Sequence, residues 1–93
     1  MIIGLIVLDL HLPHARSLKE KRMVLNRIRD RIRQRFNAAF AELDFQDVWQ
    51  RARLGVVTLN SQKTIVEGQL QAVLRDVERN FEGETMVVEV QYF

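Results

Sequence analysis

The sequence of 93 residues predicts an α+β domain of the ferredoxin-like type, with a four-stranded antiparallel sheet and two helices on one of its faces. Two segments with helical periodicity alternate with four β-rich segments in the order βαββαβ, and no linker or repeat interrupts them. Right-handed crossovers in each half then bring both helices to the same side of the sheet. We therefore expect residues 1–93 to form a single domain.

The first strand and the first helix are the clearest elements. Residues Ile2–Leu12 are apolar and largely β-branched, which is typical of a central strand, and Pro13 ends the run. Ser17 and Glu20 have the spacing of a capping box and predict the start of a helix. Apolar residues recur after them at steps of three and four as far as about Phe36, so the helix is expected to be amphipathic and to end there.

The remaining elements follow from alternation, turn residues and a second apolar stripe. Alternating side chains predict strands, and a stripe with helical spacing predicts another amphipathic helix. In order, we expect a strand at Ala38–Asp44, a strand at about Arg51–Leu59, a helix capped by Asn60 or Ser61 and ending near Asn80, and a strand at Met86–Phe93.

The charges are segregated along the chain. The totals are 14 Lys+Arg and 12 Asp+Glu, a formal net charge of only +2. Residues 16–35 carry nine basic and two acidic side chains, a net charge of +7, whereas the other 73 residues carry five basic and ten acidic ones, a net charge of −5. The first helix is therefore the segment on which we expect an anionic partner.

On a helical wheel, the basic residues of this helix lie on both flanks of its apolar stripe. Arginine suits phosphate because its planar fork binds two oxygens at once. Ordinary surface helices mix acidic and basic residues at a spacing of four, whereas here like charges repel each other. We predict nucleic-acid binding, while an acidic protein partner and a merely solvated face stay open. The predicted contacts are Arg22, Arg29 and Arg33 first, on one flank, and Lys19, Arg27 and Arg31 second.

The sheet face that lies away from the helices is expected to mix an apolar patch with charges of both signs. Such a face suits contact with a second copy of the chain, so we predict a homo-oligomer. The alternative is scattered surface apolar groups with weak cross-strand ion pairs. The apolar residues assigned to this interface are Ile3, Leu5, Val7, Phe40, Val57 and Val87, and the charged ones are Asp9, His11, Glu42, Asp44, Arg51, Arg53 and Glu89.

Enzymatic and metal chemistry have weak support in the sequence. The chain has no cysteine, which excludes disulfides and thiolate ligands. Asp9, His11 and His14 lack the spacing of a dedicated zinc motif, and the carboxylate of Asp44 is explained by a cross-strand pair with Arg51 or Arg53. We expect no enzyme activity, no cofactor and no metal. No apolar run approaches the ~20 residues that span a bilayer, so a cytoplasmic protein without membrane contact is expected.

A resemblance to a known family rests on five segments: Leu10–Pro13, Ser17–Arg22, Phe36-Asn37, Ala41–Asp44 and Gln46–Gly55. Together they resemble the YlxP-like family, a small bacterial domain of unknown function, over nearly the whole chain. The resemblance implies a ferredoxin-like fold and a gene neighbourhood rich in translation and ribosome-maturation factors, and hence RNA or a ribosomal surface as the partner. It implies no catalytic residue. The alternative is a ligand-binding or structural homo-oligomer with no nucleic-acid role.

Overall fold

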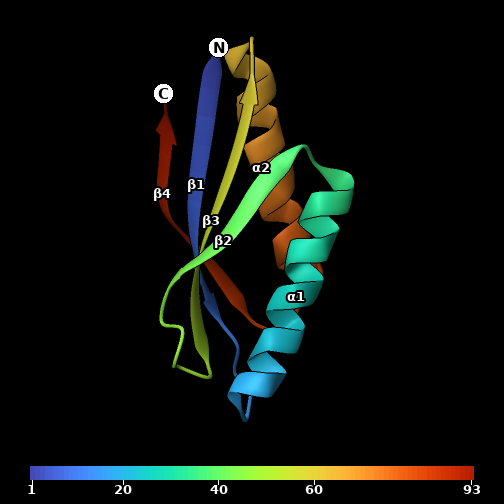
Figure 1. Cartoon of the computed structure of the whole chain (residues 1–93), viewed down its shortest axis with the longest axis vertical. Helices are drawn as coiled ribbons and strands as arrows, with labels where there is room; N and C mark the ends of the chain where they lie inside the picture. The colour runs from blue at the N-terminus through green and yellow to red at the C-terminus, as the bar shows by residue number, and fades with distance from the viewer.

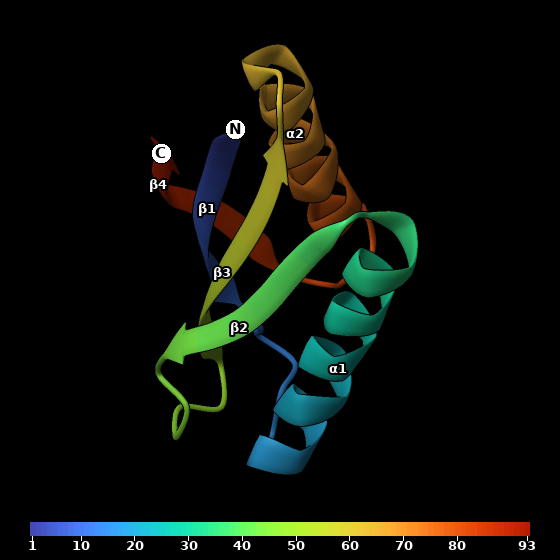
Figure 2. The same cartoon turned by 45° about the horizontal axis from the view of Figure 1, so that its top comes forward.

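The computed structural model describes residues 1–93 as four strands and two helices in the predicted order. All strand pairs are antiparallel, the sheet order is β2-β3-β1-β4, and both helices cover one face of the sheet (Figures 1 and 2). The predicted ferredoxin-like fold is confirmed. The elements are β1 (Ile2–His11), α1 (Leu18–Arg35), β2 (Ala38–Asp44), β3 (Arg51–Asn60), α2 (Lys63–Arg79) and β4 (Glu84–Tyr92).

The core lies between the sheet and the helices, because alternate residues of the two central strands point toward the helical side. α1 packs against β2, and α2 packs against β1 and β3. Gly4 allows this close packing, since a Cβ atom there would lie 2.3 Å from Cγ1 of Val66. The core residues include Ile6, Leu8 and Leu10 of β1, Ala52, Leu54 and Val56 of β3, Leu25, Ile28 and Ile32 of α1, and Val66, Leu70, Val73 and Val77 of α2.

The two helices begin differently. The Glu20 N–H donates to Oγ of Ser17 at 3.1 Å, as the capping box predicts, and the Glu20 carboxylate accepts the Arg16 N–H at 2.7 Å. α2 begins at Lys63, later than expected, and its N-cap residue makes no side-chain bond. Asn60 instead accepts the Gln62 N–H in a turn that precedes the helix. The prediction that Asn60 or Ser61 caps this helix is therefore wrong.

Strand β2 has the opposite phase from the one predicted. Phe40 pairs with Val56 and packs against the core, and Glu42 pairs with the buried Leu54. Both side chains therefore lie on the helical side, and the assignment of Phe40 to the open-face interface is wrong. The physical reason is Lys21 of α1. Its side chain is buried beneath the helix, and its charge draws the Glu42 carboxylate to the helical side of the sheet.

Strand β4 contains a bulge that the sequence pattern does not show. The pairing with β1 shifts between Val7 and Leu8, so that Val87 pairs with Leu8, whose side chain is in the core. Val87 therefore lies on the helical side, and its assignment to the open face is wrong. Val7 does lie on the open face, but only 5% of it is exposed. A charged substitution at Val7 would consequently test the stability of the fold rather than an interface.

Candidate nucleic-acid interface

The arginines of α1 divide between two grooves, as the helical wheel predicts. Arg22, Arg29 and Arg33 line a groove of about 290 Å³ between α1 and β2. On the other flank, Arg31 and Arg35 line a groove of about 380 Å³ that faces α2. The basic helix therefore presents arginine to both sides of its exposed surface.

The second helix adds basic residues that the sequence analysis did not consider. Arg75 and Arg79 of α2 line the same groove as Arg31 and Arg35, so that four arginines from two helices face one another across it. The signal was present in the sequence, because Arg75 and Arg79 are four residues apart and share one face of a helix. It was hidden by the acidic balance of the chain outside residues 16–35.

One acidic residue, Asp76 of α2, organises this groove. It accepts hydrogen bonds from Nε and Nη2 of Arg31, both at 3.2 Å, and from Nη1 of Arg35 at 3.5 Å. The Asp76 side chain is 9% exposed, whereas the arginines are partly open to solvent. Two guanidinium groups of α1 are thereby held in place on the rim of the groove.

Several predicted contact residues have no acidic partner. Among the predicted set, Arg29 pairs with Asp30 at 3.2 Å and Arg31 pairs with Asp76. The side chains of the others form no ion pair, and the same is true of both arginines of α2. The basic residues of the two helices left without a carboxylate are Lys19, Arg22, Arg27, Arg33, Lys63, Arg75 and Arg79.

Lys21 differs from every other basic residue of α1 because it is 1% exposed. Its Nζ donates to the carbonyl oxygen of Phe45 at 2.6 Å and lies 3.0 Å from Oε2 of Glu42. That Glu42 oxygen is buried and receives no hydrogen bond, so the contact is an ion pair without good hydrogen-bond geometry. Phe45 has a left-handed φ of 64°, and Lys21 holds its carbonyl group. Lys21 is thus a structural residue that fastens the β2–β3 loop to the helix.

The two arginines of the open sheet face share one carboxylate. Asp9 accepts hydrogen bonds from Nε and Nη2 of Arg53 at 2.7 and 3.0 Å, and from Nη2 of Arg51 at 2.8 Å. The hydrogen bond from Arg53 lowers the pKa of Asp9 to about 2, burial opposes this, and Arg51 adds to it. Asp44 lies opposite Arg53 in the strand register, as expected, but its carboxylate accepts the Phe45 N–H and forms no close ion pair with either arginine.

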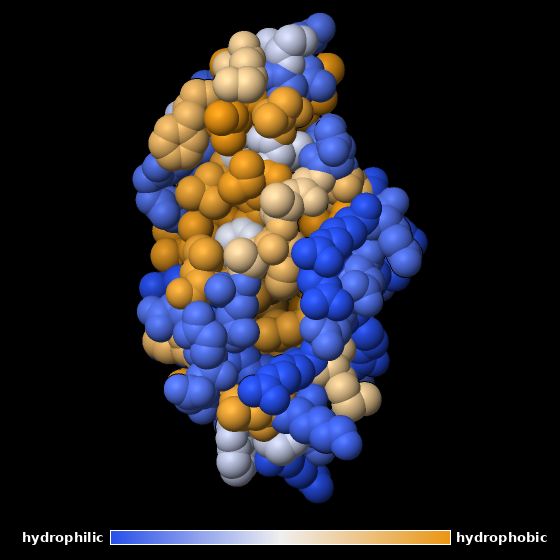
Figure 3. All heavy atoms as spheres, in the orientation of Figure 1, coloured by the Kyte–Doolittle hydropathy of each residue, from blue (hydrophilic) through white to orange (hydrophobic).

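The rest of the open face is notably apolar. Figure 3 shows hydrophobic surface across the upper part of the sheet, bordered by hydrophilic surface along α1 and below. Of the predicted interface residues, Ile3, Leu5 and Val57 lie here and are partly or well exposed. The large exposed residues that join them are Leu43, Leu59 and Phe93, and Met86 lies lower on the same face, opposite Asp9.

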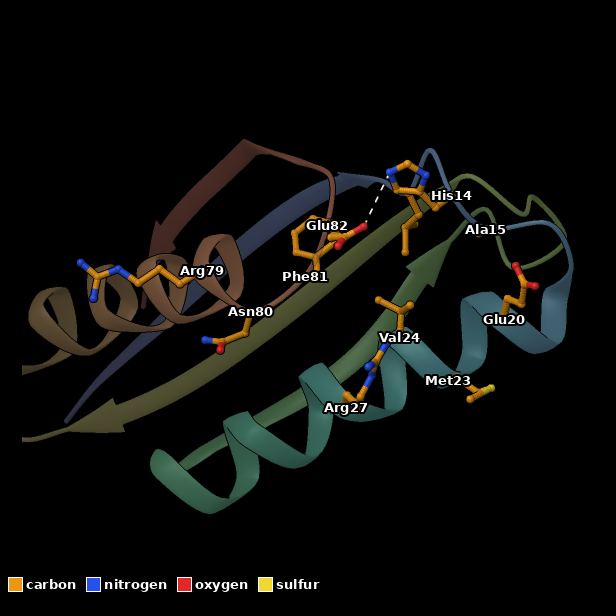
Figure 4. A pocket seen from close by; sticks show the side chains of 11 residues that line it. His14, Ala15, Glu20, Met23, Val24, Arg27, Arg79, Asn80, Phe81 and Glu82 are labelled. Carbon is orange, nitrogen blue, oxygen red and sulfur yellow. Dashed lines mark ion pairs between the residues drawn. The ribbon is translucent and has the colours of Figure 1, made fainter.

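A cavity of about 550 Å³ lies beside the groove, between the first turns of α1 and the end of α2. Figure 4 shows Arg27 rising from α1 toward this cavity, whereas Arg79 extends away from it along α2. His14 and Glu82 approach to 3.7 Å at its edge. Leu12, Ala15, Met23, Val24 and Phe81 supply its apolar lining. Arg79 and Asn80 border both the cavity and the groove, so the two hollows are neighbours.

The side chains weighed as metal ligands are placed apart. Asp9 is occupied by two guanidinium groups, and His14 is directed toward Glu82. No three His, Asp or Glu side chains gather closely enough to hold a metal ion. Neither helix is both long enough and apolar enough to span a bilayer.

The fold and this surface define a small ferredoxin-like α+β domain whose helical face is rich in arginine. The chain belongs to the family described as "Protein of unknown function (DUF503)", which it matches over residues 3–90. It is 38% identical over 79 residues to the "Uncharacterized protein YlxP" of Bacillus subtilis (strain 168), and this match covers 85% of the chain and 86% of that protein. The predicted resemblance to the YlxP-like family is confirmed.

A solved structure supports the fold alone. The "De novo designed protein Foldit4" superposes with a TM-score of 0.53 over 99% of this chain and 94% of that chain, at 13% sequence identity. At this identity the similarity carries no functional information.

Proposed function

We propose that the protein is a non-enzymatic RNA-binding module that contacts the phosphate backbone through the groove between α1 and α2. One observation carries the proposal: arginines of both helices line one groove, and Arg75 and Arg79 there have no acidic partner. Arg27, in the neighbouring cavity, is likewise unpaired. Uncompensated arginines on two facing elements are the electrostatic footprint of a polyanion.

The groove combines free and oriented guanidinium groups. Arg31 donates hydrogen bonds to Asp76 from Nε and Nη2, and its Nη1 can donate to another acceptor. An arginine that is already held loses less side-chain entropy when it binds a phosphate than a mobile one does. The free arginines add charge, and each phosphate that they neutralise releases counterions.

The contacts are expected to read the backbone rather than the sequence. The groove contains Phe36 as its only aromatic residue, and the exposed aromatic residues of the sheet, Tyr92 and Phe93, lie on opposite faces and offer no common stacking platform. RNA is favoured over DNA by the gene neighbourhood that the YlxP-like resemblance implies. A ribosomal surface would offer the same backbone chemistry, and the cytoplasm is the corresponding location.

This proposal changes the order of the predicted contacts. Arg22 and Arg33 become secondary, because their groove holds fewer arginines and Arg29 within it is paired with Asp30. Arg27 moves to the primary set, together with Arg75 and Arg79 of α2. Lys19 and Arg31 stay secondary.

Fluorescence anisotropy with a labelled RNA, repeated over a range of salt concentrations, tests the proposal. The wild-type affinity is expected to fall steeply with salt, with a log–log slope of several units. The variant R27E/R75E/R79E is expected to lose binding, whereas the matched variant R22E/R29E/R33E, with the same change in charge, is expected to lose much less. Absence of RNA binding by the wild-type protein at low salt would contradict the proposal.

A further inference from the structure

We infer that the open face of the sheet is the contact surface for a second copy of this chain, so that two sheets pack face to face and the helices point outward. This inference concerns the side of the molecule that the proposed RNA groove leaves unused, and it does not depend on RNA binding. We call this surface the sheet patch, and it consists of Ile3, Leu5, Ala39, Ala41, Leu43, Val57, Leu59 and Phe93.

Several apolar side chains of the sheet patch are exposed to solvent. Val57 is 37% exposed, Leu43 48%, and Leu59 51%. On the helical side of β3, Ala52, Leu54, Val56 and Thr58 are at most 3% exposed, so most of the strand has one covered face and one uncovered face. Apolar side chains gathered on one sheet face, rather than scattered, indicate an interaction surface.

The centre of the patch carries small side chains, which suits sheet-on-sheet packing. Gly55 lies near its centre, and Leu43 of β2 lies across it, since a Cβ atom on Gly55 would be 2.9 Å from Cδ1 of Leu43. Ala39 and Ala41, also on β2, carry small side chains. Val7 fills the space beside Gly55 and is already buried. A surface without deep hollows meets another sheet at the usual spacing of about 10 Å.

The available area is sufficient for a dimer. Strands β1 and β3 have ten residues each, which at about 3.3 Å per residue gives a length of roughly 33 Å. Four strands about 4.8 Å apart give a width of roughly 19 Å, and so a flat face of about 600 Å². Two such faces bury about 1,200 Å², the lower limit for a specific interface. Side-chain relief adds to this figure.

The charges on this face select a second copy over a nucleic acid. Arg51 and Arg53 are neutralised in part by Asp9, and Glu84 and Glu89 lie exposed on β4. A face with both signs can complement a copy of itself, whereas the exposed carboxylates of Glu84 and Glu89 repel a polyanion. On β1 and β3, the apolar residues and the cluster of Asp9, Arg51 and Arg53 occupy opposite halves, while Glu89 of β4 lies at the boundary, opposite Val7.

This distribution of apolar and charged residues determines the two-fold axis that we expect for the dimer. A two-fold axis that runs parallel to the strands places β1 of one copy over β3 of the other and brings the apolar halves together. It also places Arg51 and Arg53 of one copy over Asp9 and His11 of the other. An axis across the strands would set apolar halves against charged ones, which costs desolvation of the charges. The pair then carries one arginine groove on each outer side, and a long RNA can engage both.

Sedimentation equilibrium on the wild-type protein and two lysine variants tests the inference. Val57→Lys places a charge in the sheet patch, while Val90→Lys is a matched control, because Val90 is also an exposed strand valine, at 44%, but faces the helical side. The wild type and Val90→Lys are expected to show twice the 10.9 kDa chain mass at about 100 µM, and Val57→Lys the single mass. Circular dichroism confirms that each variant is folded.

Two results would overturn the inference. One is a monomeric wild-type protein whose melting temperature is independent of concentration, because a dimer must gain stability with concentration. The other is a Val57→Lys variant that keeps the double mass while Val90→Lys loses it, because this pattern would move the contact to the edge of β4. The concentration dependence of the wild-type melting temperature keeps the test decisive if Val57→Lys fails to fold.

Discussion

The helical face and the open sheet face of this small domain both carry arginine, but they use it in opposite ways. On the sheet, Arg51 and Arg53 donate to the same carboxylate, Asp9. On the helices, Arg75 and Arg79 have no acidic partner. The difference shows that the number of arginines does not identify a binding surface. The balance between arginines and nearby carboxylates is the better guide, and on it we base the proposals of an anion on the helical face and of an apolar contact on the sheet.

Lys21 is the clearest exception to this contrast, because it lies on the basic helix and yet stabilises the fold. Lys21→Ala would leave Glu42 in a mostly buried position without its cation, and we expect a loss of about 3 kcal/mol in the free energy of unfolding. Lys19→Ala on the same helix is exposed and is expected to change stability by less than about 0.5 kcal/mol. Urea unfolding measures both. Equal effects would show that Lys21 is an ordinary surface lysine.

Asp9 is the carboxylate that pairs with both arginines of the sheet face, whereas Arg75 and Arg79 of α2 have no such partner. Its folded pKa of about 2 lies below the ordinary value of 3.8, so its ionised form stabilises the fold at neutral pH and this contribution is lost as the pH falls through 2. Asp9→Asn should cost about 2 kcal/mol at neutral pH. Urea unfolding from neutral pH to about pH 2 should show the two proteins converging in acid. A constant difference would rule out this pH linkage.

Removing the charge of Asp76 would make the helical face more positive. Asp76→Asn removes the negative charge between Arg31 and Arg35, and we expect RNA affinity to rise by about threefold to tenfold at low salt. The free energy of unfolding should fall by about 1 kcal/mol, because charge-assisted hydrogen bonds are lost. Anisotropy titrations and urea unfolding give the two values. An unchanged affinity would place the phosphates outside this groove.

The smallest expected effect is at Gly68 on the outer side of α2. A Cβ atom there meets nothing within 4 Å, and the residue is in mid-helix. Gly68→Ala should therefore stabilise the domain by about 0.5–1 kcal/mol and leave both the oligomer mass and RNA affinity unchanged. Thermal unfolding measures the gain, and a loss of stability would mean that α2 is covered at this point.

Most of the fold was predictable because its signals are local. The long apolar run of β1 and the Ser17 capping box predict elements that the structure confirms. The sequence did not show which residues of β2 face the helices. Phe40 and Glu42 share one face of the strand, but Phe40 suits the core, whereas Glu42 suits water. The buried ion pair with Lys21 decides this, and it joins residues 21 apart in the sequence.

The bulge in β4 and the second half of the arginine groove escaped prediction for similar reasons. Val87 and Val88 look alike in the sequence, so nothing there marks where the alternation shifts. Arg75 and Arg79 lie on a helix of mixed charge and gain their significance only beside Arg31 across the groove. Local pattern identifies an element, whereas the side that it presents depends on contacts with distant residues.

The most direct test of the two-face account is sedimentation of the protein with a short labelled RNA, because one experiment reports both the protein mass and the bound RNA. The wild type should carry RNA as a dimer, Val57→Lys should carry it as a monomer, and R27E/R75E/R79E should stay a dimer without RNA. Loss of the dimer and of RNA binding together in either variant, with the fold intact, would contradict the account.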